Sequence, residues 1–387
     1  NIFAVLAAAW FVILLAVHSR LLGKCEKEEK QLQIIEQYEA RRNGDWKKFT
    51  EDGGSFITEE NKDLMDLNIL GSNSLFQWLN IAYTKSGKRK LMRQLTKTEF
   101  EEDSWKQMQC AVKEMTEHTS FSVKFQAILS GIRSIREQDF EDRKLYPAEC
   151  KKPEWISILI GSVLALSMIV SLVLSLFEVI SFGTAGIVLL ICLCNFCVFS
   201  YFHGQEYEEI GKCIHAFGKM ERLISFVSEE KFREDMLCRC RKKIRLGKNT
   251  MHRISTIASF YYAKENMFSN ILFNVVFVLN PLLVFLYRNT MKEGSEILYE
   301  TMDSIEKIEL IMALAGTAWS KDTVCMPENT KDISFSAKEM KHPLLLEVEC
   351  IANDFSCGEE IVIITGSNMS GKSSFMRTIG VNLVLMY

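Results

Sequence analysis

An almost uninterrupted apolar segment, residues 155–202, constrains the fold of this chain more than any other feature. Glu178 is its only charged residue, and Gly183 and Gly186 allow a tight turn close by. The parts on either side of Glu178 are each long enough to cross a bilayer core of roughly 30 Å as a helix. A buried hairpin of a soluble protein is the alternative, but so long a segment with one charge is too apolar for it. We predict a transmembrane helical hairpin over residues 154–203.

A second apolar segment, residues 2–22, has no charged residue before Arg20. No basic segment precedes it and no small-residue cleavage site follows it, so a membrane span is a better interpretation than a signal peptide. We predict this span over residues 1–23. Residues 268–287 are also long enough to cross, but three asparagines and Pro281 would be costly in lipid, and we expect buried core helices there.

Basic residues around the predicted hairpin indicate which of its ends are cytoplasmic. The turn near Glu178 has no Lys or Arg, whereas both flanks of the hairpin are basic, with Arg143, Lys144, Lys151 and Lys152 before it and Lys212, Lys219 and Arg222 after it. The positive-inside rule then places both flanks in the cytoplasm. Arg20, Lys24 and Lys27 place the end of the first span on the same side.

A glycine-containing motif follows an apolar, β-branched run at residues 360–365 that suits a buried strand. The pattern G-x-x-x-x-G-K-[ST] is matched at every fixed position. Residues 374–386 contain no proline and can continue as a helix. Strand, loop and helix in this order predict a phosphate-binding loop. Its candidate residues are Gly366, Ser367, Asn368, Met369, Ser370, Gly371, Lys372, Ser373 and Ser374.

The residue types in this loop suit nucleotide chemistry. Gly366 and Gly371 let the backbone curl closely around phosphate oxygens, where a Cβ would intrude. Backbone N–H groups at a helix N-terminus favour an anion. Lys372 would reach the β- and γ-phosphates, and the Ser373 hydroxyl would ligate Mg²⁺. We therefore predict ATP and Mg²⁺ as cofactors.

The remaining sequence is largely helical in pattern and carries little net charge. The formal net charge is −3, so no global polycation points to nucleic acid. One local basic cluster, residues 239–248, would suit phosphate backbones or anionic lipid head groups. A solvated helix face is the alternative, and the acidic residues just upstream favour it.

Several segments resemble the MutS family of mismatch-repair ATPases. The start of that family's ATPase domain is similar to residues 342–385, which read HPLLLEVECIANDFSCGEEIVIITGSNMSGKSSFMRTIGVNLVL. Residues 66–95 and 303–315 resemble its helical core. A bacterial membrane-bound branch of MutS-related proteins is more similar still. The resemblance to that branch rests on the GSNMxGKS loop, a transmembrane hairpin, Trp46, Phe49, Gly53 or Gly54, and Phe56.

The resemblance implies a mainly α fold with transmembrane helices, followed by the start of an α/β P-loop NTPase domain. The expected order is a span at 1–23, a cytoplasmic helical region at 24–153 that is core-like from about residue 60, the hairpin at 154–203, a helical core or lever region at 204–330, and the first part of the ATPase domain at 331–387. Because the chain begins with Asn and stops soon after the loop, we expect a truncated fragment.

The resemblance also implies site residues and partners. Lys372 and Ser373 match the family's phosphate and Mg²⁺ residues, Ile351 matches a residue that flanks the adenine, and Asn353 lies in the same motif. Cys350 stands where mismatch-repair members often have an aromatic residue. The expected partners are a second copy through the ATPase domain, the lipid bilayer and, as a further candidate, DNA. The expected location is the bacterial inner membrane, crossed several times, with the ATPase domain in the cytoplasm.

The expected function is that of a membrane-anchored MutS-like ATP-binding protein or ATPase of the DNA mismatch repair type, acting on mismatched or branched DNA. Nothing in the sequence corresponds to the family's mismatch-reading domain, and FEE at residues 100–102 matches its wedge by spelling only. The family's Mg²⁺ and water-activating motif would lie beyond Tyr387, so we expect this chain to bind ATP without turning it over.

An ATP-driven membrane scaffold or remodelling protein with a non-DNA partner is the alternative function. The missing mismatch-reading domain and the near-neutral charge favour it. An ABC-type transporter is disfavoured, because Met369 stands where such loops usually have glycine and because the predicted spans are too few.

Overall fold

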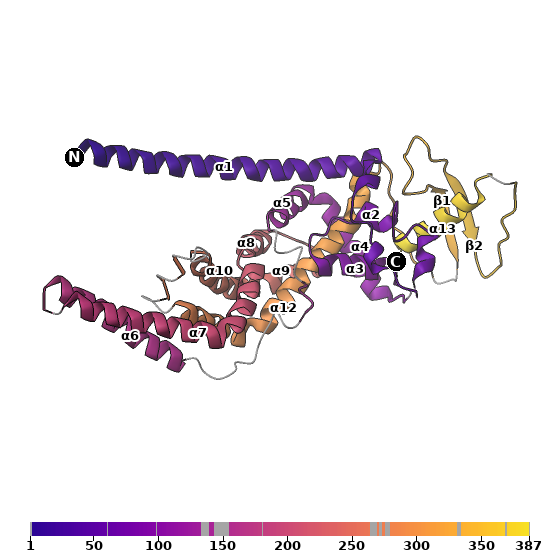
Figure 1. The fold of residues 1–387 in the computed structure, drawn as a ribbon. Coiled ribbons are helices and arrows are strands. Elements are labelled where there is room, and N and C mark those ends of the chain that lie inside the picture. The colour runs from indigo at the N-terminus through magenta and orange to yellow at the C-terminus, as the bar shows by residue number, and fades with distance from the viewer. Residues whose placement is uncertain are drawn as a thin grey trace. The chain divides into compact units, whose positions relative to one another are not determined.

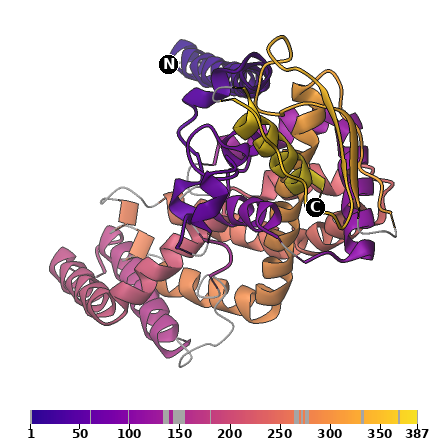
Figure 2. The same ribbon diagram turned by 90° about the vertical axis from the view of Figure 1, so that its right-hand side faces the viewer.

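Helices form most of the chain (Figure 1 and Figure 2). The computed structural model describes residues 2–59, 61–97, 99–132, 139–142, 155–179, 181–263, 269–270, 273–274, 279–330, 334–367 and 370–386. The chain forms two compact units. Unit 1 comprises Asn1–Arg133, Lys231–Arg239 and Glu306–Tyr387, and unit 2 comprises Ser134–Glu230 and Cys240–Ile305.

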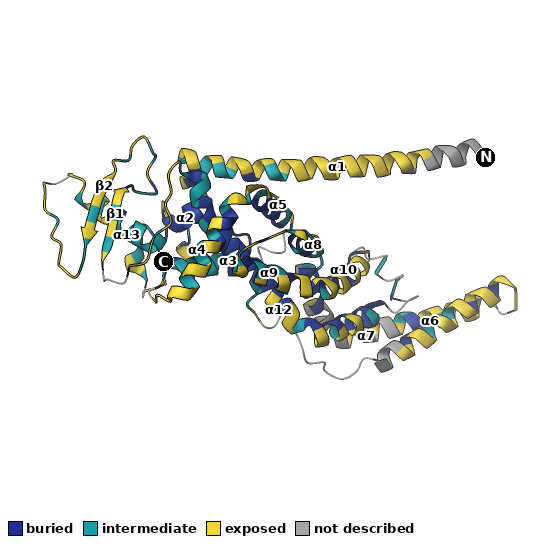
Figure 3. Ribbon diagram, turned by 180° about the vertical axis from the view of Figure 1, so that it is seen from behind, coloured by how far each residue is buried: buried dark blue, intermediate teal, exposed yellow. Residues whose placement is uncertain are grey.

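Unit 1 begins with the long helix α1 (Ile2–Asn43), which is anchored at its C-terminal end. Trp10 and most other described side chains of its first half are exposed (Figure 3). Near the other end, the buried Arg41 guanidinium donates hydrogen bonds to the carbonyls of Trp78 at 2.9 Å and Asn80 at 2.7 Å. Burial lowers the pKa of Arg41 to about 10, so this cation is held by carbonyl dipoles in a largely apolar setting.

A turn-rich segment joins α1 to two short helices. Its elements are η1 (Asp45–Lys48), η2 (Gly54–Phe56), η3 (Lys62–Met65), α2 (Leu75–Leu79) and α3 (Lys85–Leu95). Gly53 has a φ of 78°, and a Cβ there would come within 2.8 Å of the Phe76 ring, so this close approach requires glycine. The Ser74 hydroxyl accepts an N–H from the first turn of α2 at 3.2 Å, and the Thr84 hydroxyl does the same for α3 at 2.8 Å.

Helices α4 (Glu102–Glu117) and α5 (Thr119–Ser130) complete the first helical part of unit 1. α5 packs on α1. The buried Glu114 carboxylate of α4 accepts the backbone N–H groups of Arg233 at 2.6 Å and Glu234 at 2.8 Å. This carboxylate therefore fixes the segment 231–239 within unit 1.

Helix α12 (Leu279–Ser320) belongs in part to each unit. In unit 1 its buried Glu309 carboxylate accepts the N–H groups of Tyr83 at 2.7 Å and Thr84 at 3.3 Å, and also the Thr84 hydroxyl. Burial raises the pKa of Glu309 to about 7, against the opposing effect of these hydrogen bonds. Through this contact α12 fixes the start of α3.

The last part of unit 1 contains a β-hairpin and a helix. Strands β1 (Phe335–Met340) and β2 (Asn353–Cys357) pair antiparallel, with Phe335 opposite Cys357 and a register shift before Met340. Glu339 lies in this bulge with a φ of 49°, and its N–H donates to the Asp354 carboxylate at 2.7 Å. Helix α13 (Lys372–Met386) follows β2.

Unit 2 is helical within its described residues. Its elements are α6 (Trp155–Leu176), α7 (Phe182–Phe217), α8 (Glu221–Glu229), α10 (Lys248–Ala263), most of α9 (Asp235–Leu246) and the first part of α12. α6 packs along α7, and the C-terminal part of α7 packs on α10. The core includes Ile214, Phe217, Leu223, Ile254 and Leu298, which are all buried. In contrast, most described side chains of α6 are exposed (Figure 3).

The structure corrects the predicted membrane topology. Within the residues it describes, one helix is long and apolar enough to cross a bilayer, with its candidate window at Leu159–Leu176 of α6. The expectation of several transmembrane helices is therefore wrong. The other two apolar segments belong to helices of 42 and 36 residues, α1 and α7, that continue into charged sequence. The basic residues predicted to precede the hairpin, Arg143 to Lys152, lie outside the described residues.

The expected start of an α/β P-loop domain is also wrong. β1 and β2 are the only strands in the described part of the chain, and they form a two-stranded antiparallel sheet. Residues 360–365, expected as a buried strand, are not part of a sheet, and Ile361 and Ile363 are 91% and 81% exposed. An apolar run forms a central strand only where neighbouring strands satisfy its backbone, and no described strand pairs with this run.

Candidate functional site

The glycine loop keeps a curled shape even without its expected strand. The Lys372 ammonium folds back and donates hydrogen bonds to the carbonyls of Gly366 at 2.6 Å and of Ser367. A Cβ at Gly366 would lie 2.9 Å from the Ser370 hydroxyl, so a side chain there would require this hydroxyl to shift. Gly371 has a φ of 87°, in the left-handed region that favours glycine. Gly371 therefore has a backbone conformation that favours glycine, and Gly366 lies against the Ser370 hydroxyl.

Helix α13 begins directly after this loop. The N–H of Phe375 donates to the carbonyl of Gly371 at 2.8 Å, which closes the first helical turn. Ser373 and Ser374 lie exposed in that turn. The N-terminal N–H groups of a helix have no partner within it, so this end offers donors and a partial positive charge to an anion. Two predicted loop residues, Asn368 and Met369, lie outside the described residues.

Contacts along α13 hold the loop in place. The Phe375 ring packs edge-on against Phe355 of β2, with 5.8 Å between the ring centroids. The Arg377 guanidinium donates to the carbonyl of Asp66 at 2.9 Å. The Asn382 amide donates to the carbonyl of Lys341 at 3.0 Å. These contacts tie the helix to β2, to the segment before α2 and to the residue that follows β1.

Ile351, which matches a residue that flanks the adenine, and Asn353 of the same motif are not joined to the loop by hydrogen bonds within the described chain. Ile351 is 82% exposed just before β2. Asn353 opens β2, and its amide donates to the carbonyl of Ile351 at 3.1 Å. The packing of Phe355 against Phe375 places the strand that carries Asn353 beside the first turn of α13. The structure thus brings Gly366, Ser370 and Lys372 together and leaves Ile351 on the surface.

This arrangement fits a phosphate chain with Mg²⁺. Gly366 leaves the space that a side chain would fill, the start of α13 supplies backbone donors, and Lys372 supplies a cation next to the loop. The exposed Ser373 hydroxyl is one hard oxygen ligand of the kind that Mg²⁺ takes, and phosphate oxygens and water supply the others in such sites.

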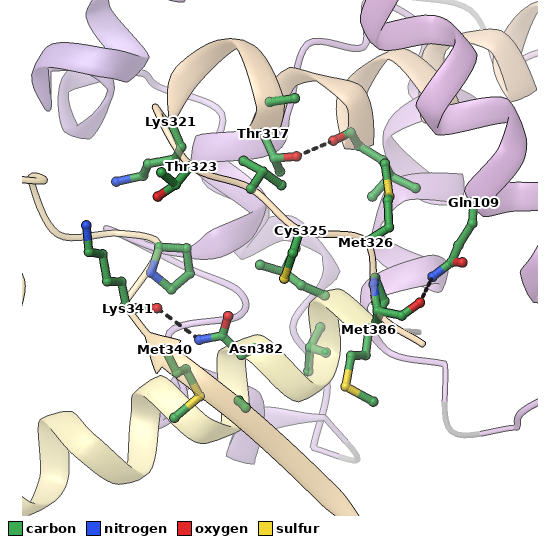
Figure 4. A pocket seen from close by; sticks show the side chains of 18 of the residues that line it. Gln109, Thr317, Lys321, Thr323, Cys325, Met326, Met340, Lys341, Asn382 and Met386 are labelled. Atoms are coloured by element: carbon green, nitrogen blue, oxygen red, sulfur yellow. Dashed lines mark hydrogen bonds between the residues drawn. The ribbon is translucent and has the colours of Figure 1, made fainter. Parts of the chain in front are cut away.

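A second feature, which the sequence analysis missed, lies near the opposite end of α13. A cavity of about 680 Å³ in unit 1 is lined by α4, the end of α12, the segment that follows α12, β1 and the last turn of α13 (Figure 4). His342 lies at its edge, where burial lowers the pKa of the imidazole and Arg377 and Lys321 lower it further. No local motif marks this cavity, because its walls come from segments more than two hundred residues apart in the chain.

Comparison with known proteins gives similarity to MutS proteins over part of the chain. The chain is 31% identical over 103 residues to the DNA mismatch repair protein MutS of Listeria welshimeri, which is 25% of this chain and 12% of that protein. It is 36% identical over 83 residues to MutS of Parasynechococcus marenigrum, covering 20% and 9%. It is 30% identical over 129 residues to MutS protein homolog 4 of Candida albicans, covering 32% and 16%. No family model matches the chain.

These similarities support a distant relation to MutS proteins. The chain spans only a small part of the length of each of these relatives.

Proposed function

We propose that this chain is a MutS-related ATP-binding protein in which residues 366–374 hold the phosphates of the nucleotide. One observation carries the proposal: Lys372 folds onto the loop carbonyls at the N-terminus of a 15-residue helix, beside a glycine that leaves open the space of a side chain. Similarity to MutS proteins over a quarter of the chain supports it.

Each loop residue has a defined part in this proposal. Backbone N–H groups at the start of α13 bind phosphate oxygens, and Lys372 leaves its carbonyl partners to pair with the β- and γ-phosphates. Ser373 ligates Mg²⁺, which neutralises phosphate charge when it is bound. Ile351 lies exposed before β2, where an adenine ring can stack on it.

Removal of the Lys372 ammonium tests the loop. We expect Lys372→Ala to weaken binding of a fluorescent ATP analogue about 10- to 100-fold, because a hydrogen bond to a charged group contributes roughly 1.5–3 kcal/mol. Fluorescence titration of the full chain in nanodiscs measures this change. The exposed Lys97 supplies the matched control, and Lys97→Ala should bind as the parent does. Equal affinity of the Lys372→Ala protein and the parent would contradict the proposal.

The Mg²⁺ role of Ser373 needs a separate measurement. We expect Ser373→Ala to bind the analogue as the parent does in EDTA but to lose the gain in affinity that added Mg²⁺ gives the parent. The neighbouring Ser374→Ala variant is the control, and it should keep that gain. A full Mg²⁺ response in the Ser373→Ala protein would remove Ser373 from the metal site.

We further propose that the protein acts at the bacterial inner membrane as a homodimer, with mismatched or branched DNA as its client. The DNA client is supported by the relatives named as DNA mismatch repair proteins. The membrane location is supported by the candidate span at Leu159–Leu176. A second candidate function, ATP-driven remodelling or scaffolding of the membrane without DNA, is favoured by the exposed apolar side chains of that helix.

DNA binding by the full chain in nanodiscs separates these two functions. Homoduplex, mismatched and branched DNA are titrated at two salt concentrations, with and without ATP. We expect a mismatch or branch preference that survives added salt and responds to ATP. Weak binding that salt abolishes equally for all three DNAs reflects phosphate contacts alone and would favour the membrane function without DNA.

A further inference from the structure

The cavity at the end of α13 is distinct from the nucleotide loop. The loop ends in the first turn of α13, and the cavity is lined by the last turn of that helix. At 1.5 Å per residue, the two ends of this 15-residue helix are about 20 Å apart. A ligand in the cavity would therefore leave the loop free for nucleotide.

The cavity has an apolar, sulfur-rich part. Met108 of α4, Met326 after α12, Met340 of β1 and Met386 of α13 all line it. Figure 4 shows Met326 and Met386 on the side of Gln109, with Cys325 between them and the lysines. Methionine side chains are flexible and polarizable, so a wall built from them adapts to apolar ligands of different shape.

The other side of the cavity carries charges of both signs, because Glu347 lies beside the two lysines that line it. Lys321 and Lys341 lie together on this side, away from Met326 and Met386 (Figure 4). The Lys321 ammonium donates to the carbonyl of Leu345 at 2.7 Å and lies 5.7 Å from the centroid of the Trp78 ring, so no carboxylate is its hydrogen-bond partner there. Burial lowers the pKa of Lys321, and the nearby Glu347 carboxylate opposes this effect in part. A second anion next to Lys321 would offset more of the desolvation.

The charges around these lysines are partly balanced. Lys341 pairs with Glu347 at 2.9 Å. The nearby Asp322 pairs with Arg42. Glu347 and Asp322 also act on Lys321 through charge, while the hydrogen bond of its ammonium goes to the carbonyl of Leu345. A ligand with one anionic group and an apolar body would complement both parts of the cavity.

We infer that this cavity binds a small amphipathic anion, with its anionic group beside Lys321 and Lys341 and its apolar body beside Met326 and Met386. A volume of about 680 Å³ lies within the range of pockets that hold small organic ligands. The chemistry is shared by free medium-chain carboxylates and by the anionic lipids of a bilayer, so the experiment must distinguish these two sources.

Methyl NMR of the full chain in nanodiscs tests the inference directly. The protein is labelled at the methionine methyl groups, held in zwitterionic lipid without nucleotide, and titrated with octanoate. We expect saturable shifts at Met108, Met326, Met340 and Met386, and none at the buried Met291 and Met302 of unit 2. Octanol and octylammonium, which lack the negative charge, should bind at least about tenfold more weakly.

Two variants test the two parts of the cavity separately. Lys321→Gln keeps a hydrogen-bond donor for the carbonyl of Leu345 but removes the charge, and we expect about tenfold weaker octanoate binding. Met326→Trp fills the apolar part and should abolish the shifts while Lys321 stays intact. Lys97→Gln, on the exposed surface outside the cavity, should bind octanoate as the parent does.

A final pair of samples identifies the source of the ligand. Shifts of the same four methyl groups in anionic-lipid nanodiscs without octanoate would assign the site to lipid, and their absence would assign it to a free anion. The inference would be overturned by octanol binding as tightly as octanoate, by unchanged affinity in both the Lys321→Gln and Met326→Trp proteins, or by shifts spread over all methionines. Because no nucleotide is present, failure here leaves the result of the ATP titration unaffected.

Discussion

Two apolar helical segments of unit 2 have opposite environments. In α6 the described apolar side chains are mostly exposed, and Leu166 is 63% exposed. At the start of α12, Leu283, Val284 and Tyr287 are buried. Both segments are apolar enough in sequence to be considered as membrane spans. The apolar composition of a helix indicates that its surface must be kept from water. Whether other protein segments cover that surface depends on the helices that pack next to it.

Asparagines in residues 268–287, the segment that includes the start of α12, indicated from sequence that it is not a membrane span. Asn270, Asn274 and Asn280 argued against lipid, and we expected buried core helices. The Asn274 side chain accepts the N–H of Asn280 at 2.7 Å and donates to the carbonyl of Asn270 at 2.7 Å. Residues 279–287 are helical and most of their side chains are buried, whereas Phe285 and Leu286 are exposed. Within this segment, the structure does not describe residues 268, 271–272 and 275–278.

The largest expected difference in stability comes from a leucine-to-alanine substitution made separately in α12 and in α6. Leu283→Ala removes a buried side chain and should lower the free energy of unfolding by about 2–5 kcal/mol. Leu166→Ala removes an exposed side chain and should change it by less than about 0.5 kcal/mol. Urea unfolding in detergent, followed by circular dichroism, measures both. Equal losses would mean that α6 is packed in protein as closely as α12.

A smaller effect is expected from pH at the other end of α12. The folded state keeps Glu309 protonated up to about pH 7, whereas an unfolded carboxyl loses its proton near pH 4.5. The contribution of Glu309 to the free energy of unfolding is therefore fully present below about pH 4.5 and is lost as pH rises to about 7. The difference is roughly 3 kcal/mol. Tryptophan fluorescence during urea unfolding at pH 5 and pH 8 reports it for unit 1.

The matched variants for this pH effect are Glu309→Gln and Glu99→Gln. A neutral amide cannot titrate, so Glu309→Gln should flatten the pH dependence, while the exposed Glu99→Gln should keep it. A parent protein that is more stable at pH 8 than at pH 5, with that difference removed in Glu309→Gln, would show that the hydrogen bonds from Tyr83 and Thr84 outweigh burial and keep the carboxylate ionised.

The smallest expected contrast concerns two glycines. A Cβ at Gly247 would overlap the Thr301 side chain of α12, so Gly247→Ala should destabilise by about 1–3 kcal/mol. A Cβ at Gly186 of α7 would meet nothing within 4 Å, so Gly186→Ala should stabilise the helix by about 0.5–1 kcal/mol. Hydrogen exchange of the amides of α7 and α12 measures both changes. Destabilisation by Gly186→Ala would indicate a neighbour packed against that face of α7.

Much of the candidate loop was predictable from sequence, because its requirements are local. Gly366 and Gly371 are needed where the backbone approaches a neighbour or takes a positive φ, and Lys372 follows at the spacing that lets it return to the loop. The strand expected before the loop was wrong, since a strand depends on partners elsewhere in the chain. The domain boundaries proposed from sequence remain predictions.

Other features were outside the reach of any local pattern. Glu309 holds the start of α3 from 225 residues away in the chain, and the sequence marks it only as one charge in an amphipathic helix. The charged side of the cavity joins Lys321, just after α12, to Lys341, just after β1.

The sequence by itself determined the helical character of most of the chain, the need of α6 for an apolar environment and the curled glycine loop at the start of α13. These properties depend on the side-chain period and on the backbone freedom of residues close together in the chain. The tertiary structure alone decided which apolar face is covered, that residues 361–367 lie outside any sheet, and that four methionines share one cavity with two lysines. Such outcomes follow from contacts between distant segments, whose free energies depend on packing that no single segment encodes.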